Sequence, residues 1–225
     1  MTILGLETAT AVCSVGIFQT GKTEVERHFL EPRVHSERIL SIIDELLRSQ
    51  HLGLDEVDAV AVSQGPGSFT GLRIGFSTAK GLCYATGRGL IAVSTFDGIA
   101  EAAAADVPNA RNILVALDAK KGDFYSGLYE LRDGNLVRQT EISVGLPTFK
   151  SNSDHPDLLL TDRGDLLKPF FGTGTDIRPV FDFCRGDVIA RLGGTRAAAG
   201  EFADAATCEP AYLKDFVVKG RGSAG

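Results

Sequence analysis

The sequence predicts an α/β protein built of two similar halves. Three strand patterns are followed by alternating helices and strands, and a second set of three strands begins about 110 residues later. The opening strands of the two sets, ILGLET and ILVALD, end in Glu7 and Asp118. Three antiparallel strands followed by an αβαβα order are typical of a ribonuclease-H-like half. We therefore expect two such domains, at 1–108 and 109–225, with the second degenerate.

The first half is predicted from alternating apolar patterns and helix-capping residues. Ser36, Ser68 and Thr95 are suited to cap the starts of three helices, and Gly87 is suited to end the second. The expected elements are strands at 2–8, 12–19 and 23–30, a helix at 36–50, a strand at 57–63, a helix at 68–86, a strand at 90–94 and a helix from residue 95.

In the second half, the patterns that predict helices and strands are weaker after the first three strands. For this reason we expect the second half to be degenerate. The final ten residues, FVVKGRGSAG, are typical of a mobile, weakly basic tail. The expected elements are strands at 113–118, 123–131 and 136–144, helices near 186–191 and 195–202, and a segment at 210–215 that closes the fold.

Composition excludes several classes of protein. The net charge of −6 gives no global field that would attract nucleic acid, so any RNA contact is expected through a partner. The four cysteines are widely spaced, which argues against zinc and disulfides and favours a reducing cytosol. No signal peptide and no apolar run of about 20 residues is evident, so we expect a cytoplasmic protein without a membrane contact.

Glycine is in excess, at 26 of 225 residues, and seven glycines lie between Gly65 and Gly89. Gly67, Gly71 and Gly75 recur every four residues along the second helix, where each interior glycine costs about 1 kcal/mol against alanine. This small-residue ridge packs either on the protein's own sheet or on a neighbouring helix. Only two residues of that helix are charged, which favours a protein–protein surface, so we expect these glycines chiefly to make room for a neighbouring helix.

The first helix carries an apolar stripe about 160° wide, broader than the stripe of a helix with one buried face. Either the helix is deeply buried in the core, or part of the stripe meets a partner. The candidate partner-binding residues on the two helices are Ile39, Leu40, Ile43, Leu47, Phe69, Gly71, Leu72, Arg73, Gly75, Phe76 and Lys80.

The glycine loop 64–68, QGPGS, lies between a strand and a helix N-terminus, where free amides can hold an anion. The loop has neither the Walker pattern nor G-x-G-x-x-G, so a tight turn into a closely packed helix is the favoured interpretation. The residues of a vestigial nucleotide site would be Glu7, Gly65, Gly67, Ser68 and Asp118.

Successive blocks of the chain, ILGLETAT, HSERIL, GPGSFTGLRIG, ALDAKKGDFYSGLY and EPAYLKD, resemble the bacterial TsaB (YeaZ) family over nearly the whole length. The resemblance implies the actin-like ATPase (ASKHA) fold of two ribonuclease-H-like halves. It also implies a subunit of the machinery that installs threonylcarbamoyl on the tRNA adenosine next to the anticodon. In that family the chain pairs with its catalytic paralogue TsaD through the two helices above, and the ATPase TsaE joins the pair.

The resemblance also implies that the chain is not an enzyme by itself. The catalytic paralogue has two metal-binding histidines four residues apart, whereas this chain has His35 but Ile39 at the second position. Glu7 stands where the family more often has aspartate. We therefore expect no catalytic residue, metal or cofactor, and contact with tRNA only through the complex. The apolar helices also favour a homodimer when the protein is alone.

Two other hypotheses remain open at this point. One is an ATP-binding phosphotransferase or ATPase of the same fold, which would use Glu7, Asp118 and the loop 65–68. The other is a peptidase, which ranks lower because no Ser/His/Asp set or complete metal motif can be assembled.

Overall fold

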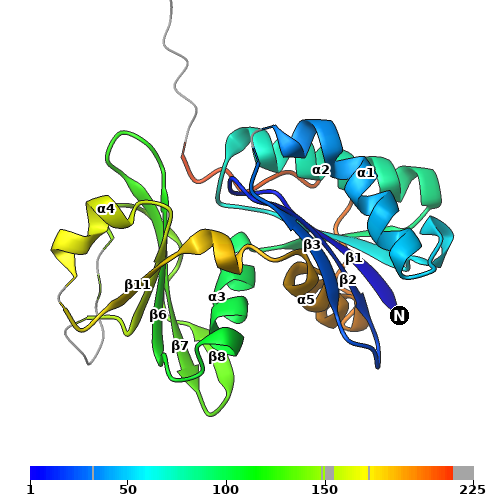
Figure 1. Ribbon diagram of the computed structural model, residues 1–225. Coiled ribbons are helices and arrows are strands. Elements are labelled where there is room, and N and C mark those ends of the chain that lie inside the picture. The colour runs from blue at the N-terminus through cyan, green and yellow to red at the C-terminus, as the bar shows by residue number, and fades with distance from the viewer. Residues whose placement is uncertain (32, 148, 150–154, 172, 215–225) are drawn as a thin grey trace, which may run out of the picture.

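The computed structural model describes residues 1–31, 33–147, 149, 155–171 and 173–214, and each half is built on one mixed sheet (Figure 1). The first sheet has the order β3-β2-β1-β4-β5. In this sheet β1 pairs with β2 and β2 with β3 in antiparallel fashion, whereas β4 runs parallel to β1 and β5 parallel to β4. The strands are β1 (Thr2–Glu7), β2 (Cys13–Gln19), β3 (Val25–Phe29), β4 (Ala59–Ser63) and β5 (Gly89–Val93).

The second sheet repeats this plan with the order β11-β10-β6-β7-β8, and β9 adds to β7. Again the first three strands, β6, β7 and β8, pair in antiparallel fashion. The strands β10 and β11 then extend the sheet in parallel from β6. The strands are β6 (Asn112–Asp118), β7 (Phe124–Arg132), β8 (Asn135–Arg138), β9 (Ser143–Gly145), β10 (Leu158–Thr161) and β11 (Asp176–Pro179). The shared order confirms the predicted fold of two ribonuclease-H-like halves.

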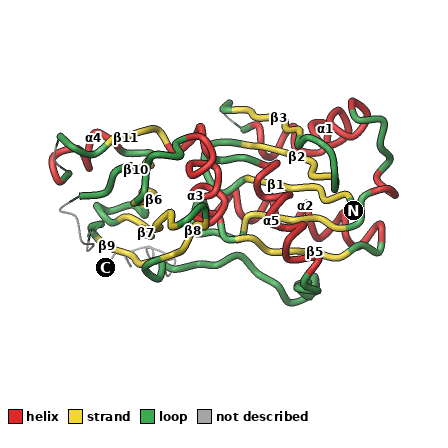
Figure 2. The backbone as a smooth tube through the Cα atoms, turned by 90° about the horizontal axis from the view of Figure 1, so that it is seen from below, coloured by secondary structure: helices red, strands yellow, loops and turns green. Residues whose placement is uncertain are grey.

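The helices cover the two sheets, and two of them pack on the sheet of the other half. The helices α1 (Val34–Ser49) and α2 (Phe69–Thr86) cover one face of the first sheet, as Figures 1 and 2 show together. The helix α5 (Gly186–Ala198), from the end of the chain, packs on the opposite face of that sheet. In return α3 (Thr95–Asp106), which follows β5, packs on the second sheet. The shorter helical segments are η1 (Leu54–Glu56), α4 (Gly164–Leu167), η2 (Lys168–Phe170) and η3 (Val180–Phe183).

Part of the glycine excess is explained by α5. A methyl group on Gly5 would overlap the carbonyl oxygen of Gly186, and one on Gly16 would overlap the backbone of Asp187. The helix therefore starts in backbone contact with β1 and β2. The Ser14 hydroxyl fixes this contact by accepting a hydrogen bond from the Gly186 amide at 2.8 Å.

Two of the predicted helix caps are wrong. The α1 helix begins two residues before Ser36, after Arg33 in a left-handed conformation, and the Ser36 hydroxyl donates to the Arg33 carbonyl instead. The Ser94 hydroxyl, one residue before the predicted Thr95, caps α3 by accepting from the Asp97 amide. By contrast, Ser68 caps α2 and Gly87 ends it with a positive φ, as predicted.

The second half departs further from the sequence prediction. The strands β10 and β11 were not predicted, because four residues each are too short to show a period. The predicted strand at 136–144 is two strands, β8 and β9, and the two predicted helices after residue 186 are the single helix α5. The predicted tail 216–225 lies outside the described residues.

All four cysteines are free in the structure. No helix in the described part of the chain is long and apolar enough to cross a membrane.

Candidate functional site

The helix α1 buries most of the candidate partner-binding residues that the sequence placed on it. Ile39, Ile43 and Leu47 belong to the core between α1, α2 and the first sheet. Leu40 is different, because it points away from that core and 62% of it is exposed. Of the four candidates on α1, Leu40 is therefore the one that can touch another molecule without unfolding the helix.

The helix α2 shows the same division. Leu72 and Phe76 are buried, whereas Arg73 is exposed and Phe69 and Lys80 are half-buried. Tyr84, which the sequence analysis did not select, is 93% exposed. The remaining exposed positions of α2 carry a small side chain or none, at Thr70, Ser77, Gly81 and Ala85. Tyr84 could have been found by following the outward face at helical spacing, rather than the glycine ridge.

The glycine ridge of α2 faces the protein's own backbone. A methyl group would overlap the Ala9 carbonyl oxygen if built on Gly67, and the Thr8 carbonyl oxygen if built on Gly71. At Gly75 it would overlap the Thr8 side chain. These three glycines let α2 lie against the turn after β1, which corrects the expectation that they clear a neighbouring helix.

A groove of about 370 Å³ lies between α1 and α2 on their outer side. Leu40 from α1 and Ile74 from α2 are apolar residues of its lining, and Arg73 and Glu37 bring one charge of each sign. Its other lining residues are His35, Ser36, Ile39, Ser77 and Thr78. A shallow groove with small side chains and little charge is suited to a helix of another protein.

The glycine loop is engaged by the chain itself. The Gly65 amide donates to Thr95 Oγ1 at 3.0 Å, and the Ser68 amide donates to the Ala9 carbonyl at 2.6 Å. The Ala211 amide donates to the Gln64 carbonyl at 2.8 Å, so the C-terminal segment lies against the loop. This arrangement supports the interpretation of a tight turn, because these amides are not free for a phosphate.

The two acidic strand ends sit in different surroundings. Glu7 is 1% exposed, and burial raises the pKa of its carboxyl to about 7, although hydrogen bonds from the Ala9 amide and Ser63 act in the opposite direction. Asp118 accepts from both the backbone amide and the ammonium group of Lys120, at 2.7 and 2.8 Å. Its partial burial would raise its pKa, but Lys120 and Arg163 hold that pKa below the ordinary value.

His35 also has a partner within the chain. Its Nε2 lies 2.8 Å from the Val12 carbonyl oxygen, and Ile39, one turn later, is buried in the core. Within the described residues, no group of three or more His, Cys, Asp or Glu side chains is placed to hold a metal ion.

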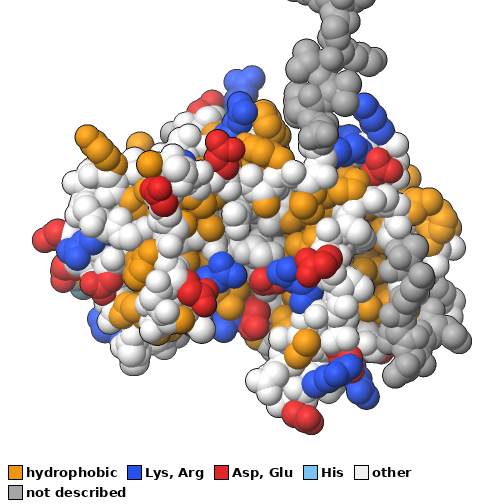
Figure 3. Space-filling view, turned by 180° about the vertical axis from the view of Figure 1, so that it is seen from behind, with side chains coloured by type: hydrophobic (Ala, Val, Ile, Leu, Met, Phe, Trp, Pro, Cys, Tyr) orange, Lys and Arg blue, Asp and Glu red, His pale blue; other side chains and the backbone are white. Residues whose placement is uncertain are grey.

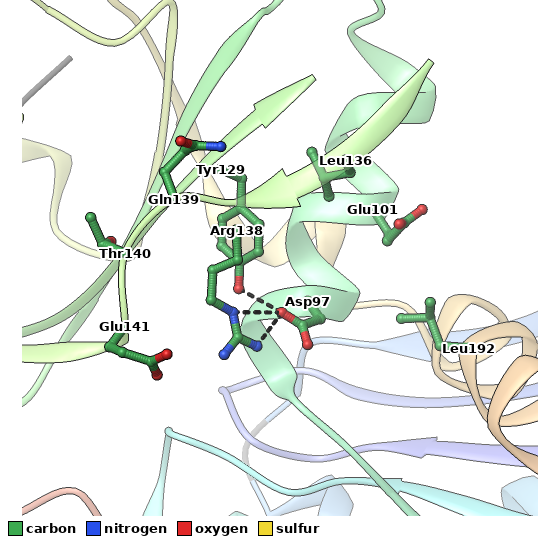
Figure 4. A pocket seen from close by; sticks show the side chains of 9 residues that line it. All are labelled: Asp97, Glu101, Tyr129, Leu136, Arg138, Gln139, Thr140, Glu141 and Leu192. Carbon is green, nitrogen blue, oxygen red and sulfur yellow. Dashed lines mark hydrogen bonds and ion pairs between the residues drawn. The ribbon is translucent and has the colours of Figure 1, made fainter. Parts of the chain in front are cut away.

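A larger hollow, of about 620 Å³, lies where α3, β8 and α5 meet, and no sequence pattern predicted it. Figure 4 shows its centre, where Asp97 accepts hydrogen bonds from both the Tyr129 hydroxyl and the Arg138 guanidinium. Charged side chains of both signs line the junction of the halves in the view from behind (Figure 3). Asp97 and Arg138 form an ion pair, so the charges at the centre of this hollow already have partners within the chain.

Comparison with known proteins gives consistent matches. Residues 30–147 match the family model TsaD, described as tRNA N6-adenosine threonylcarbamoyltransferase. The chain is 40% identical to the tRNA threonylcarbamoyladenosine biosynthesis protein TsaB of Haemophilus influenzae over 126 residues, 56% of this chain and 52% of that protein. It is 29% identical to TsaB of Bacillus subtilis over 95% of this chain and 94% of the relative. The match to Haemophilus influenzae TsaB thus spans about half the length of that protein.

Solved structures agree with the fold. YeaZ from Pseudomonas aeruginosa is 25% identical and superimposes with a TM-score of 0.81, over 94% of this chain and 99% of that one. A second Pseudomonas aeruginosa structure, described as similar to peptidase YeaZ, is 28% identical with a TM-score of 0.80. It covers 95% of this chain and 99% of the other.

Proposed function

Because this chain belongs to the TsaB (YeaZ) family of tRNA threonylcarbamoyladenosine biosynthesis proteins, which is related to TsaD, we propose that it is a non-catalytic subunit that binds and activates the catalytic paralogue TsaD. In this proposal the pair forms N6-threonylcarbamoyladenosine next to the anticodon, the ATPase TsaE joins it, and tRNA is bound through the complex in the cytoplasm.

The outer face of α1 and α2 carries the proposal. Leu40 is a large aliphatic side chain exposed at the edge of a groove with little charge, and Tyr84 extends the exposed apolar surface along α2. Exposed apolar side chains gathered on one face mark a protein interaction site. The segment that matches the TsaD family model, residues 30–147, includes both helices. The same face would join two copies when the partner is absent.

The surroundings of the acidic residues favour a non-catalytic role over the nucleotide-binding alternative. Glu7 is enclosed in the core, Asp118 is paired with Lys120, and the glycine loop bonds to Thr95 and Ala9. These groups, which would bind a nucleotide, are thus already engaged in contacts within the chain. The vestigial site formed by Glu7, Asp118 and the loop therefore supports the fold in our proposal.

Leu40→Asp is the variant that tests this function. Because Leu40 lies outside the core, the variant should fold, whereas Gly71→Leu or Leu72→Asp would disrupt the packing of α2. We expect Leu40→Asp to weaken binding to the cognate TsaD by about a hundredfold, since it places a charge in a desolvated interface, and to lower tRNA modification in the reconstituted system in parallel. Titration calorimetry measures the affinity.

Leu166→Asp is the matched control. Leu166 is 41% exposed on α4, in the other half of the molecule, and the substitution is chemically the same. We expect this variant to bind TsaD with the affinity of the parent. Equal affinities for the parent, Leu40→Asp and Leu166→Asp would contradict the proposed function.

A further inference from the structure

Arg73 is the exposed cation of the α2 surface, and aromatic groups hold it in place. Its guanidinium carbon lies 4.0 Å from the centre of the Phe69 ring, one turn earlier on the helix. Its Nε donates to the hydroxyl of Tyr212 at 3.4 Å, and the Tyr212 ring packs on Phe69 with 5.2 Å between ring centres. An arginine held by a ring face and a hydroxyl group loses little conformational freedom when it binds a ligand.

The charge of Arg73 has no carboxylate partner among the described residues, in contrast to that of several other exposed arginines. Arg38, Arg48 and Arg178 pair with carboxylates on their own or neighbouring elements. For Arg73, the described residues provide the Tyr212 hydroxyl and the Phe69 ring and no ion pair. Glu37 lines the same groove from α1, but no salt bridge joins it to Arg73 in the described structure. Within the described residues its outer nitrogen atoms, Nη1 and Nη2, form no hydrogen bond, so they remain for a group that covers the groove.

Tyr212 belongs to the C-terminal strap, residues 209–214, which runs from the glycine loop to the second half. The Ala211 amide bonds to Gln64 at one end. At the other end the Lys214 ammonium donates to the carbonyls of Ala119 and Lys120, both at 3.0 Å, and to the Asp123 carboxylate at 2.7 Å. The strap is thus fixed on both sides of Tyr212, and Tyr212 in turn fixes Arg73.

We propose that Arg73 is the charge anchor of the partner surface, that Tyr212 of the C-terminal strap positions it, and that the partner helix in the groove presents a carboxylate to it. This inference rests on the proposed function and specifies the chemistry of that same site. Charge complementarity supports it, because covering an unpaired guanidinium costs free energy unless an acid meets it. A bidentate pair would then set the register of the two proteins.

The affinity for the cognate TsaD, measured at low and high salt, tests the anchor. We expect Arg73→Gln to weaken binding about tenfold at low salt and to flatten the salt dependence. Arg73→Lys should keep the salt dependence without restoring the affinity, because lysine lacks the planar group that stacks on Phe69. Arg178→Gln, which removes an exposed arginine from β11, should bind as the parent does.

A double-mutant cycle tests the positioning residue. Tyr212→Phe keeps the ring contact with Phe69 and removes the hydroxyl, so we expect about a threefold loss of affinity in the parent and none in an Arg73→Gln background. Equal effects in both backgrounds would show that Tyr212 acts independently of Arg73, contrary to the proposal. If Arg73→Gln weakens the affinity for TsaD in the parent but not in a Glu37→Gln background, Glu37 is the acid that meets Arg73. This result would overturn the proposal that the partner supplies the carboxylate.

The outcome separates this inference from the proposed function. If Arg73→Gln binds with the affinity and salt dependence of the parent while Leu40→Asp still blocks binding, the charge anchor is wrong and the proposed function stands. If Leu40→Asp also binds as the parent does, the proposed function itself has failed.

Discussion

At the scale of single residues, Glu7 makes the stability of the fold depend on pH. Burial raises the pKa of its folded-state carboxyl from 4.5 to about 7, so between these values the folded chain holds the proton more tightly than the unfolded chain. The stability from this group is full below pH 4.5 and is lost as pH rises through about 7. The shift corresponds to about 3 kcal/mol at full ionisation.

Glu7→Gln should remove this dependence. The amide has the same size, can still accept from the Ala9 amide, and carries no charge at any pH. We expect the variant to be more stable than the parent by up to about 3 kcal/mol near pH 8, with the advantage disappearing toward pH 4.5. Urea unfolding across this range measures the difference. A stability difference that does not change with pH would show that the Glu7 carboxyl ionises normally.

Residue positions were predictable from the sequence where local chemistry decides them, as at Ser68 and Gly87, which cap α2 as expected. They were not predictable where tertiary contacts decide. Thr95 was a suitable cap, but its hydroxyl accepts from the Gly65 amide, which only the folded chain brings near. Likewise Ile39 and Leu40 are adjacent aliphatic residues of similar size. The packing of α1 on α2 buries Ile39 in the core and leaves Leu40 on the surface.

At the scale of elements, the glycines of α2 should respond to alanine with opposite signs. Gly71→Ala would force a methyl group into the Thr8 carbonyl, so we expect a loss of about 1–3 kcal/mol in unfolding free energy. Gly81, on the outer side of the same helix, has nothing within 4 Å of an added Cβ. Gly81→Ala should therefore gain about 0.5–1 kcal/mol from helix propensity. Chemical denaturation of both variants measures the pair.

A stabilising Gly71→Ala would contradict the close approach of α2 to the turn after β1. The sequence did show that α2 has a small-residue ridge, and that the ridge packs on something. It could not show what that is, because a helix–turn contact and a helix–helix contact both need the same clearance. The first half was easier to predict than the second because each of its strands has at least five residues, whereas β10 and β11 have four residues each.

At the scale of the whole molecule, the two halves were predictable because the pattern of three opening strands occurs twice in the chain. The connection between the halves was not, because it is made by segments distant in sequence. The α5 helix packs on the first sheet and α3 on the second, so each sheet is completed by a helix from beyond its own strands. The C-terminal strap then joins the α2 side of the first half to the turn after β6.

Lys214 should be the clamp of this strap, because its ammonium group donates three hydrogen bonds into the turn formed by residues 119–123. Lys214→Met keeps the length of the side chain but removes all three, so we expect faster hydrogen exchange at the Ala211 amide and in the turn, with the core strand β4 unchanged. Lys121→Met removes a charge from the same turn without affecting these bonds, and should exchange as the parent does. Unchanged exchange at Ala211 in Lys214→Met would show that the strap is held without its clamp.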